Sequence, residues 1–223
     1  MLAEASPGGR VQHELQMVGR SLKVFLGNAG QLYATLQHFQ DPDTWMKPPD
    51  PALTGWEEID EIDRLMHNFL ASSFTLTEIT LKARKAVASD DFDQVYAEHS
   101  PFADPICVIM KLVRHDVQHA HLAGVEVYIQ APAVPNPEPG AFGLERRFFL
   151  VRKYLMALKL NAATKKYVQE HGDLPLDEIV DTYAQFVIDF ANWFAKALSE
   201  HMAEELVLTT AMRARAQELV LWP

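Results

Sequence analysis

The chain has 223 residues, of which 48% are hydrophobic and 22% charged, with ten glycines and thirteen prolines. This composition is typical of a globular protein and excludes a disordered, collagen-like or low-complexity chain. Thirty acidic against twenty basic side chains give a net charge of −10, which opposes unspecific attraction to nucleic acid and to anionic lipid.

Several features favour a cytoplasmic protein. The single cysteine, Cys107, excludes an internal disulfide and a cysteine-based zinc site. The first ten residues lack the apolar core of a signal peptide. The most apolar stretch, 184–198, contains Asp189, Asn192 and Lys196, so we expect no membrane-spanning segment.

Two long helices are predicted first. Residues 9–39 carry apolar side chains three, four and seven positions apart, which predicts one helix with a single buried stripe. Prolines between 41 and 52 end it. A second helix is predicted from Thr54, which forms a capping box with Glu57, to residue 87, packed antiparallel on the first. The helix dipole accounts for the acidic cluster in its first two turns, so no metal site is expected there. This cluster consists of Glu57, Glu58, Asp60, Glu61 and Asp63.

The middle of the chain is predicted to be mixed. Residues 89–105 are polar and broken, with aspartates that suit the start of a short helix. A third helix is predicted over 106–122 and ends at Gly124. Residues 125–129 alternate as in a strand, and the four prolines of 131–143 indicate an exposed loop.

The second half leaves one segment open. Residues 147–158 have no clean period, so a strand paired with 125–129 competes with a helix. A helix over 161–170 stops at Gly172, and a last long helix with a wide aromatic face starts near Asp177. Without repeats or linkers, we expect one all-α domain over 1–223. The expected architecture is an antiparallel helical bundle with a core of about 9–198 and a C-terminal helical extension at 199–223. If 147–158 starts as a strand, the bundle also carries a small β-hairpin insertion around 125–155.

One octapeptide, 114–121, carries the candidate chemistry because three of the nine histidines crowd into it. On a helix, Arg114, Gln118 and His121 share one face, and His115 and His119 share a neighbouring face. Arginine binds phosphate oxygens through a permanently charged fork, and histidine transfers protons near neutral pH. The combination fits RNA cleavage by a neighbouring 2′-hydroxyl, which needs no metal. A symmetric dimer would supply a second imidazole for the other oxygen.

An arginine, a polar residue after it and a histidine four to six positions later, on a late bundle helix, resembles the HEPN (higher eukaryotes and prokaryotes nucleotide-binding) domain family. Here the motif residues are Arg114, His115 and His119, with His121 as an alternative histidine. Two long helices before the motif and an aromatic helix after it extend the resemblance to about 9–198. The family more often has asparagine or aspartate at the position of His115.

The resemblance implies a metal-independent endoribonuclease without a cofactor, acting as a homodimer with Arg114, His119 and His115 at the subunit interface. Lys111, Gln118 and His121 are the expected contacts to the RNA substrate. Such domains often serve as toxins or defence effectors, restrained by a nucleotidyltransferase antitoxin. Other members lack activity and only bind nucleotides or proteins.

Two alternatives compete with the ribonuclease interpretation. In the first, His115 and His119 bind a metal with Asp116 or Glu126, as in HD-type phosphohydrolases. His67, His99 and Asp104 are the nominal further ligands in that case.

In the second alternative, Arg114 pairs with a carboxylate such as Asp116 or Glu126, and the chain is a helical binding or scaffold module. The basic pairs 146–147 and 165–166 are then solvated. A ribonuclease would instead gain from basic side chains gathered near the motif. The candidates are Lys111, Arg114, Arg146, Arg147 and Arg152.

Overall fold

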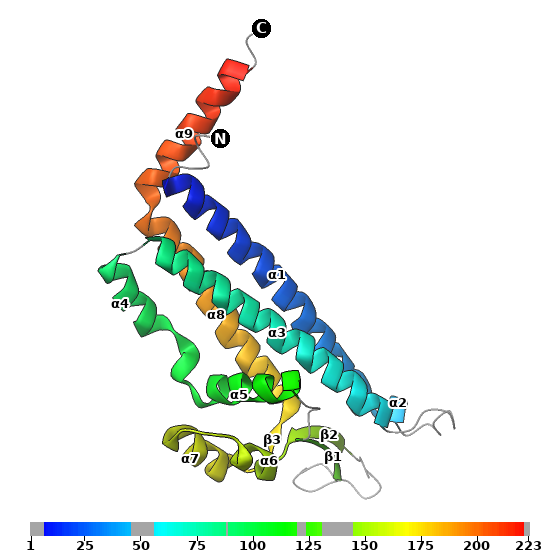
Figure 1. The fold of residues 1–223 in the computed structure, drawn as a ribbon. Coiled ribbons are helices and arrows are strands. Elements are labelled where there is room, and N and C mark those ends of the chain that lie inside the picture. The colour runs from blue at the N-terminus through cyan, green and yellow to red at the C-terminus, as the bar shows by residue number, and fades with distance from the viewer. Residues whose placement is uncertain (1–6, 46–55, 88, 120–123, 131–144, 221–223) are drawn as a thin grey trace, which may run out of the picture. The chain divides into compact units, whose positions relative to one another are not determined.

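The protein is mostly helical (Figure 1). Its computed structural model describes residues 7–45, 56–87, 89–119, 124–130 and 145–220. Over these ranges the chain forms nine α-helices and three short strands. Among the described residues, no helix combines the length and the apolar character that crossing a membrane requires.

The two predicted long helices are present and antiparallel. They are α1 (Pro7–Gln40) and α3 (Trp56–Val87). Near the start of α1, Glu14 pairs with Lys82 at 3.6 Å, and later in α1 the Asn28 side-chain amide donates to the Asn68 carbonyl at 3.2 Å. Later residues of α1 therefore meet earlier residues of α3. The predicted stripe of α1 is largely buried, and the capping box at Thr54 lies outside the described residues.

The chain divides into two compact units, and each takes a part of α1, α3 and α8 (Leu176–His201). The first unit comprises Met1–Phe25, Ser72–Pro101 and Phe186–Pro223. The second unit comprises Leu26–Ala71 and Phe102–Gln185. Both are described separately below.

An aromatic core holds the first unit together. Its own elements are α4 (Asp90–His99) and α9 (Ala203–Val220). The Tyr96 ring lies edge-on to Phe190 at 5.4 Å and to Phe194 at 5.9 Å. Ser89 caps α4 by accepting from the amide of Phe92, rather than one of the aspartates, because Ser89 is the residue with extended backbone before the first turn.

The second unit holds the remaining helices and the sheet. Its helices are the single turn α2 (Pro42–Trp45), α5 (Pro105–His119), α6 (Arg152–Ala157) and α7 (Ala162–His171). Its strands are β1 (Val125–Gln130), β2 (Glu145–Leu150) and β3 (Leu174–Pro175). A 3-10 turn (Pro101–Ala103), which begins at the last residue of the first unit, leads into α5. The strands form an antiparallel sheet in the order β1-β2-β3, with Val125 opposite Leu150.

The segment 147–158 contains both of the structures that its sequence leaves open. It pairs with β1 up to Leu150 and becomes helical at Arg152. The switch is held from outside the segment: the Val151 amide donates to the Gly124 carbonyl at 2.9 Å, and the Arg152 amide donates to Asp173 Oδ1 at 2.6 Å. The two-residue strand β3 is not predicted by the sequence. The loop predicted at 131–143 lies outside the described residues.

Candidate catalytic site on helix α5

Helix α5 is anchored at its start by Asp104. The Asp104 carboxylate accepts from the Ile106 amide at 2.8 Å, and its carbonyl accepts from the Val108 amide at 3.0 Å. Cys107, Met110 and Val113 are buried on the core side of the helix. Burial, together with the nearby Asp104 charge, raises the pKa of the Cys107 thiol to about 12, so this cysteine stays a neutral packing group.

The following turn presents the basic residues of the motif. Lys111 and His115 are exposed, whereas Arg114 is half-buried between them. Residues three and four apart share one side of a helix, so these three groups form a continuous basic strip on α5. A half-buried guanidinium at the edge of such a strip suits the binding of a phosphate oxygen.

The histidine half of the motif is described only in its backbone. Gln118 and His119 belong to the last turn of α5, but their side chains lie outside what the structure describes. His121 lies outside it altogether. The structure therefore places Arg114 and its exposed neighbours on one helix with His119, and the approach of the two side chains stays a prediction.

Asp116 is engaged by a residue that sequence reasoning missed. The hydroxyl of Tyr154, on α6, donates to Asp116 Oδ2 at 3.1 Å. Burial raises the pKa of Tyr154 well above its ordinary value, and the Asp116 charge adds to the effect. The phenol therefore stays protonated and keeps donating to the carboxylate. The sequence gives no signal for this contact, because Tyr154 lies 38 positions from Asp116 in a segment whose periodicity fits neither a strand nor a helix.

Gly124 allows the tyrosine to take this position. A Cβ at Gly124 would lie 2.1 Å from the Tyr154 ring, far inside van der Waals contact. The role that the structure shows for this glycine is to let the ring of Tyr154, on α6, pack directly on the backbone.

Several of the proposed metal ligands have other contacts in the fold, and the side chain of His119 lies outside the described residues. Within the described ranges, no three histidine, cysteine or acidic side chains converge as a metal site would require. His99 belongs to the first unit, where it stacks on Trp193 at 4.4 Å, whereas His67 and Asp104 belong to the second. Asp104 is the cap of α5 described above.

Glu126, the other nominal ligand, lies 3.3 Å from the hydroxyl of Tyr128, which is also 3.1 Å from Asp173. Burial and these two carboxylates raise the pKa of Tyr128 to about 12. Glu126 therefore belongs to a local network with Tyr128 and Asp173.

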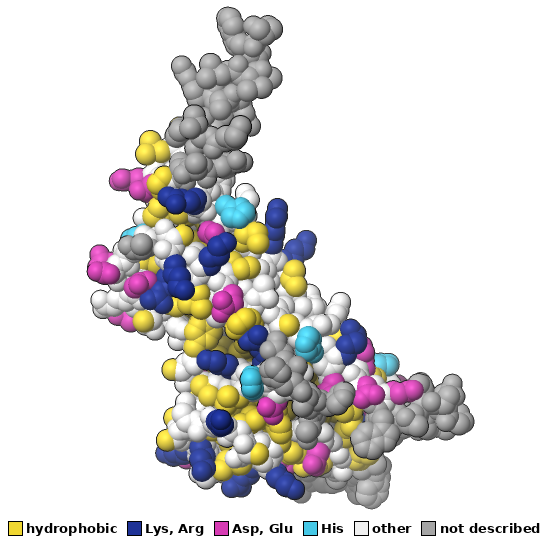
Figure 2. All heavy atoms as spheres, in the orientation of Figure 1, with side chains coloured by type: hydrophobic (Ala, Val, Ile, Leu, Met, Phe, Trp, Pro, Cys, Tyr) yellow, Lys and Arg dark blue, Asp and Glu magenta, His cyan; other side chains and the backbone are white. Residues whose placement is uncertain are grey.

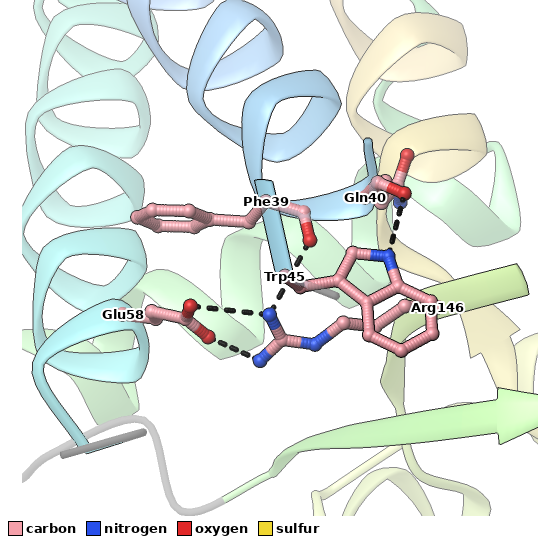
Figure 3. A network of polar contacts seen from close by, with 5 residues as sticks. All are labelled: Phe39, Gln40, Trp45, Glu58 and Arg146. Carbon is pink, nitrogen blue, oxygen red and sulfur yellow. Dashed lines mark hydrogen bonds and ion pairs between the residues drawn. The ribbon is translucent and has the colours of Figure 1, made fainter. Parts of the chain in front are cut away.

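Arg146 and Arg147 are paired rather than solvated. Arg146 forms a two-pronged ion pair with Glu58 and also donates to the carbonyl of Phe39 at the end of α1 (Figure 3). Arg147 donates to both oxygens of Asp177 at 3.0 Å and to Glu178 at 2.8 Å. These two guanidinium groups hold the sheet to the helices, so they are not the basic groups expected to assist the motif.

Comparison of the chain with protein-family models, with curated proteins and with solved structures found no match.

Proposed function

We propose that the protein is a HEPN-type, metal-independent endoribonuclease in which Arg114 binds the scissile phosphate and His119 transfers a proton. The observation that carries the proposal is the half-buried guanidinium of Arg114, flanked by exposed Lys111 and His115, on the helix that ends at His119. Its setting supports the proposal: two long antiparallel helices precede α5, and the aromatic helix α8 follows it.

The reaction requires only groups of the substrate and of the chain. The 2′-hydroxyl of the RNA attacks the adjacent phosphorus, the bond to the 5′-oxygen breaks, and the products carry a 2′,3′-cyclic phosphate and a 5′-hydroxyl. Arg114 stabilises the negative charge that develops on the phosphoryl oxygens. The His119 imidazole takes the proton from the attacking hydroxyl, and the same group of a second copy gives one to the leaving oxygen. The proposal therefore includes a homodimer.

The remaining motif residues have supporting roles in this scheme. Lys111 and His115 are exposed beside Arg114 and attract the flanking phosphates. Gln118 and His121 complete the substrate contacts in the proposal. The biological role that accompanies it is that of a toxin or defence effector restrained by a nucleotidyltransferase.

The proposal is tested by incubating the purified full-length chain with a 5′-labelled single-stranded RNA in EDTA. We expect cleavage with cyclic phosphate ends. Arg114→Ala and His119→Ala should each lower the rate by about 10²- to 10⁴-fold, because each removes a group that acts in the transition state. Arg20→Ala and His67→Ala, two exposed residues of the same types on α1 and α3, are the matched controls and should cleave normally.

Three results would contradict the proposal. Cleavage by both motif variants at the wild-type rate would assign the activity elsewhere. Activity that is lost in EDTA and restored by a transition metal would favour the phosphohydrolase interpretation. Binding of nucleotide or protein without any cleavage by the wild type would identify a non-catalytic binding module.

A further inference from the structure

The second unit contains a basic segment that the candidate site does not explain. Residues 146–169 include seven of the chain's twenty basic residues and no aspartate or glutamate, although the whole chain has a net charge of −10. Arg146 and Arg147 are used in the ion pairs described above. The other five are all exposed, and we call them the α6–α7 surface. They are Arg152, Lys153, Lys159, Lys165 and Lys166.

Nearly all of the positive charge of the α6–α7 surface is available to a ligand, because few of its residues form ion pairs. Among the described residues, only Lys166 of the α6–α7 surface has an ion pair, with Glu170 at 3.7 Å, and both side chains are exposed. Figure 2 shows Lys and Arg side chains gathered over α6 and α7, at the lower end of the view. Five like charges within fifteen residues repel one another, so folding stability does not account for their concentration.

Local structure points these side chains outward and places them beside the motif helix. Thr164 and Val168 bury one side of α7, which leaves Lys165 and Lys166 on the other side. Helix α7 packs against both α5 and α6. Tyr154, within two residues of Arg152 and Lys153, bonds to Asp116 on α5. The α6–α7 surface is therefore joined to the helix that carries Arg114.

We propose that the α6–α7 surface binds the phosphate backbone of single-stranded RNA. The inference deepens the proposed function and rests on it for the identity of the ligand, because it supplies the binding surface for the same substrate. Spaced lysines and arginines track successive phosphates without reading sequence. His171, exposed and stacked on Tyr167 at 4.1 Å, offers an aromatic ring for a base at the end of α7.

The lack of large exposed apolar side chains among the described residues of α6 and α7 favours nucleic acid over an anionic membrane. Helices that bind a membrane surface insert large apolar side chains between the headgroups. Of the large hydrophobic side chains that are exposed in the described part of the chain, none lies between 145 and 171. The cations of the α6–α7 surface therefore lack the partner groups that membrane anchoring needs.

The test measures binding separately from cleavage. The probe is a 5′-fluorescein-labelled 20-mer of 2′-O-methyluridine, which has no free 2′-hydroxyl and cannot be cut by the proposed reaction. Its anisotropy is titrated with the full-length protein between 50 and 200 mM KCl. The test variant combines Arg152→Gln, Lys153→Gln, Lys165→Gln and Lys166→Gln.

A matched variant controls for net charge. It combines Arg20→Gln, Lys23→Gln, Lys85→Gln and Lys196→Gln, which are all exposed. Both variants remove one arginine and three lysines. Each also breaks one exposed lysine–glutamate pair one helical turn apart, since Lys196 lies 3.9 Å from Glu200 as Lys166 lies near Glu170.

We expect the test variant to bind the probe at least ~10-fold more weakly. The slope of log affinity against log salt concentration should also become shallower by about 2 to 3, because each contacted phosphate of a single strand contributes about 0.7 to that slope. The matched variant should stay within about 2-fold of the wild type. A variant with only Lys153→Gln and Lys165→Gln should lose about half as much on the logarithmic scale.

The inference is overturned if both four-residue variants weaken binding equally, if the wild type does not bind the probe, or if it binds phosphatidylserine-containing vesicles in preference to the probe. These outcomes are distinct from failure of the proposed function. Normal probe binding without RNA cleavage removes the ribonuclease and leaves the α6–α7 surface. Cleavage with an unchanged KM in the test variant removes the α6–α7 surface and leaves the ribonuclease.

Discussion

Gly124 has no side chain, and this allows the close packing next to the motif. Its missing side chain lets the Tyr154 ring reach Asp116, and its carbonyl accepts from the Val151 amide where β2 turns into α6. A methyl group there must displace a rigid ring rather than a flexible chain end. Overpacking of this kind costs about 1–3 kcal/mol.

We therefore predict that Gly124→Ala destabilises the protein by about 1–3 kcal/mol, measured by urea unfolding followed by circular dichroism. Gly27→Ala is the matched control, because a Cβ at Gly27, within α1, meets nothing within 4 Å. Alanine there should instead stabilise by about 0.5–1 kcal/mol, since it favours the helix. Equal effects of the two substitutions would show that the contact with Tyr154 is unimportant.

At the same scale, the candidate site is only partly predictable. The helix that carries Arg114 follows from local spacing, because its apolar residues recur with the helical period. The contact between Tyr154 and Asp116 does not follow, because it depends on where residues 147–158 change from strand to helix. That change is set by Gly124 and Asp173, which lie outside the segment.

Among the elements, the long helices were the most predictable. Their apolar residues recur over many turns, so α1 begins and ends within two residues of the predicted limits, and α8 begins one residue before Asp177. Short elements are less predictable from the sequence. β3 has two residues, too few for any period, and it is ordered by pairing with Phe149 and Leu150 rather than by its own sequence.

Arg146 of β2 connects three of these elements, because it pairs with Glu58 of α3 and donates to the carbonyl of Phe39 at the end of α1. Only 12% of the Arg146 side chain and 26% of the Glu58 side chain are exposed. Glu58→Gln keeps the shape but leaves the guanidinium without its counter-charge. We predict a loss of about 1–3 kcal/mol in the free energy of unfolding.

The control for this prediction is Glu61→Gln, less than one turn further along α3. Its partner Arg64 lies 2.6 Å away, but the two side chains are 57% (Arg64) and 40% (Glu61) exposed. An exposed pair contributes little, so this substitution should change stability by less than about 0.5 kcal/mol. A double-mutant cycle with Arg146→Met then isolates the coupling, which should be clearly larger than in a cycle of Glu61 with Arg64.

On the scale of the whole molecule, three helices belong to both compact units. The boundaries between the units fall inside α1, α3 and α8, each of which is a single helix. Unfolding one unit alone would leave three helices with newly cut ends, each with unsatisfied backbone groups. The continuous helices therefore favour a single cooperative transition.

We predict that a cavity created in the core of either unit lowers the midpoint of one and the same unfolding transition. Phe69 lies in the second unit, edge-on to Tyr183 at 5.7 Å, and Phe194 lies in the first, edge-on to Phe92 at 5.9 Å, and both are fully buried. Phe69→Leu and Phe194→Leu should each lower the urea midpoint, by about 1–3 kcal/mol in stability, with an unchanged slope. Tryptophan fluorescence, which includes Trp193 of the first unit, should coincide with far-ultraviolet circular dichroism in both variants. Two separate transitions, each shifted by only one of the substitutions, would show instead that the units unfold independently despite the helices they share.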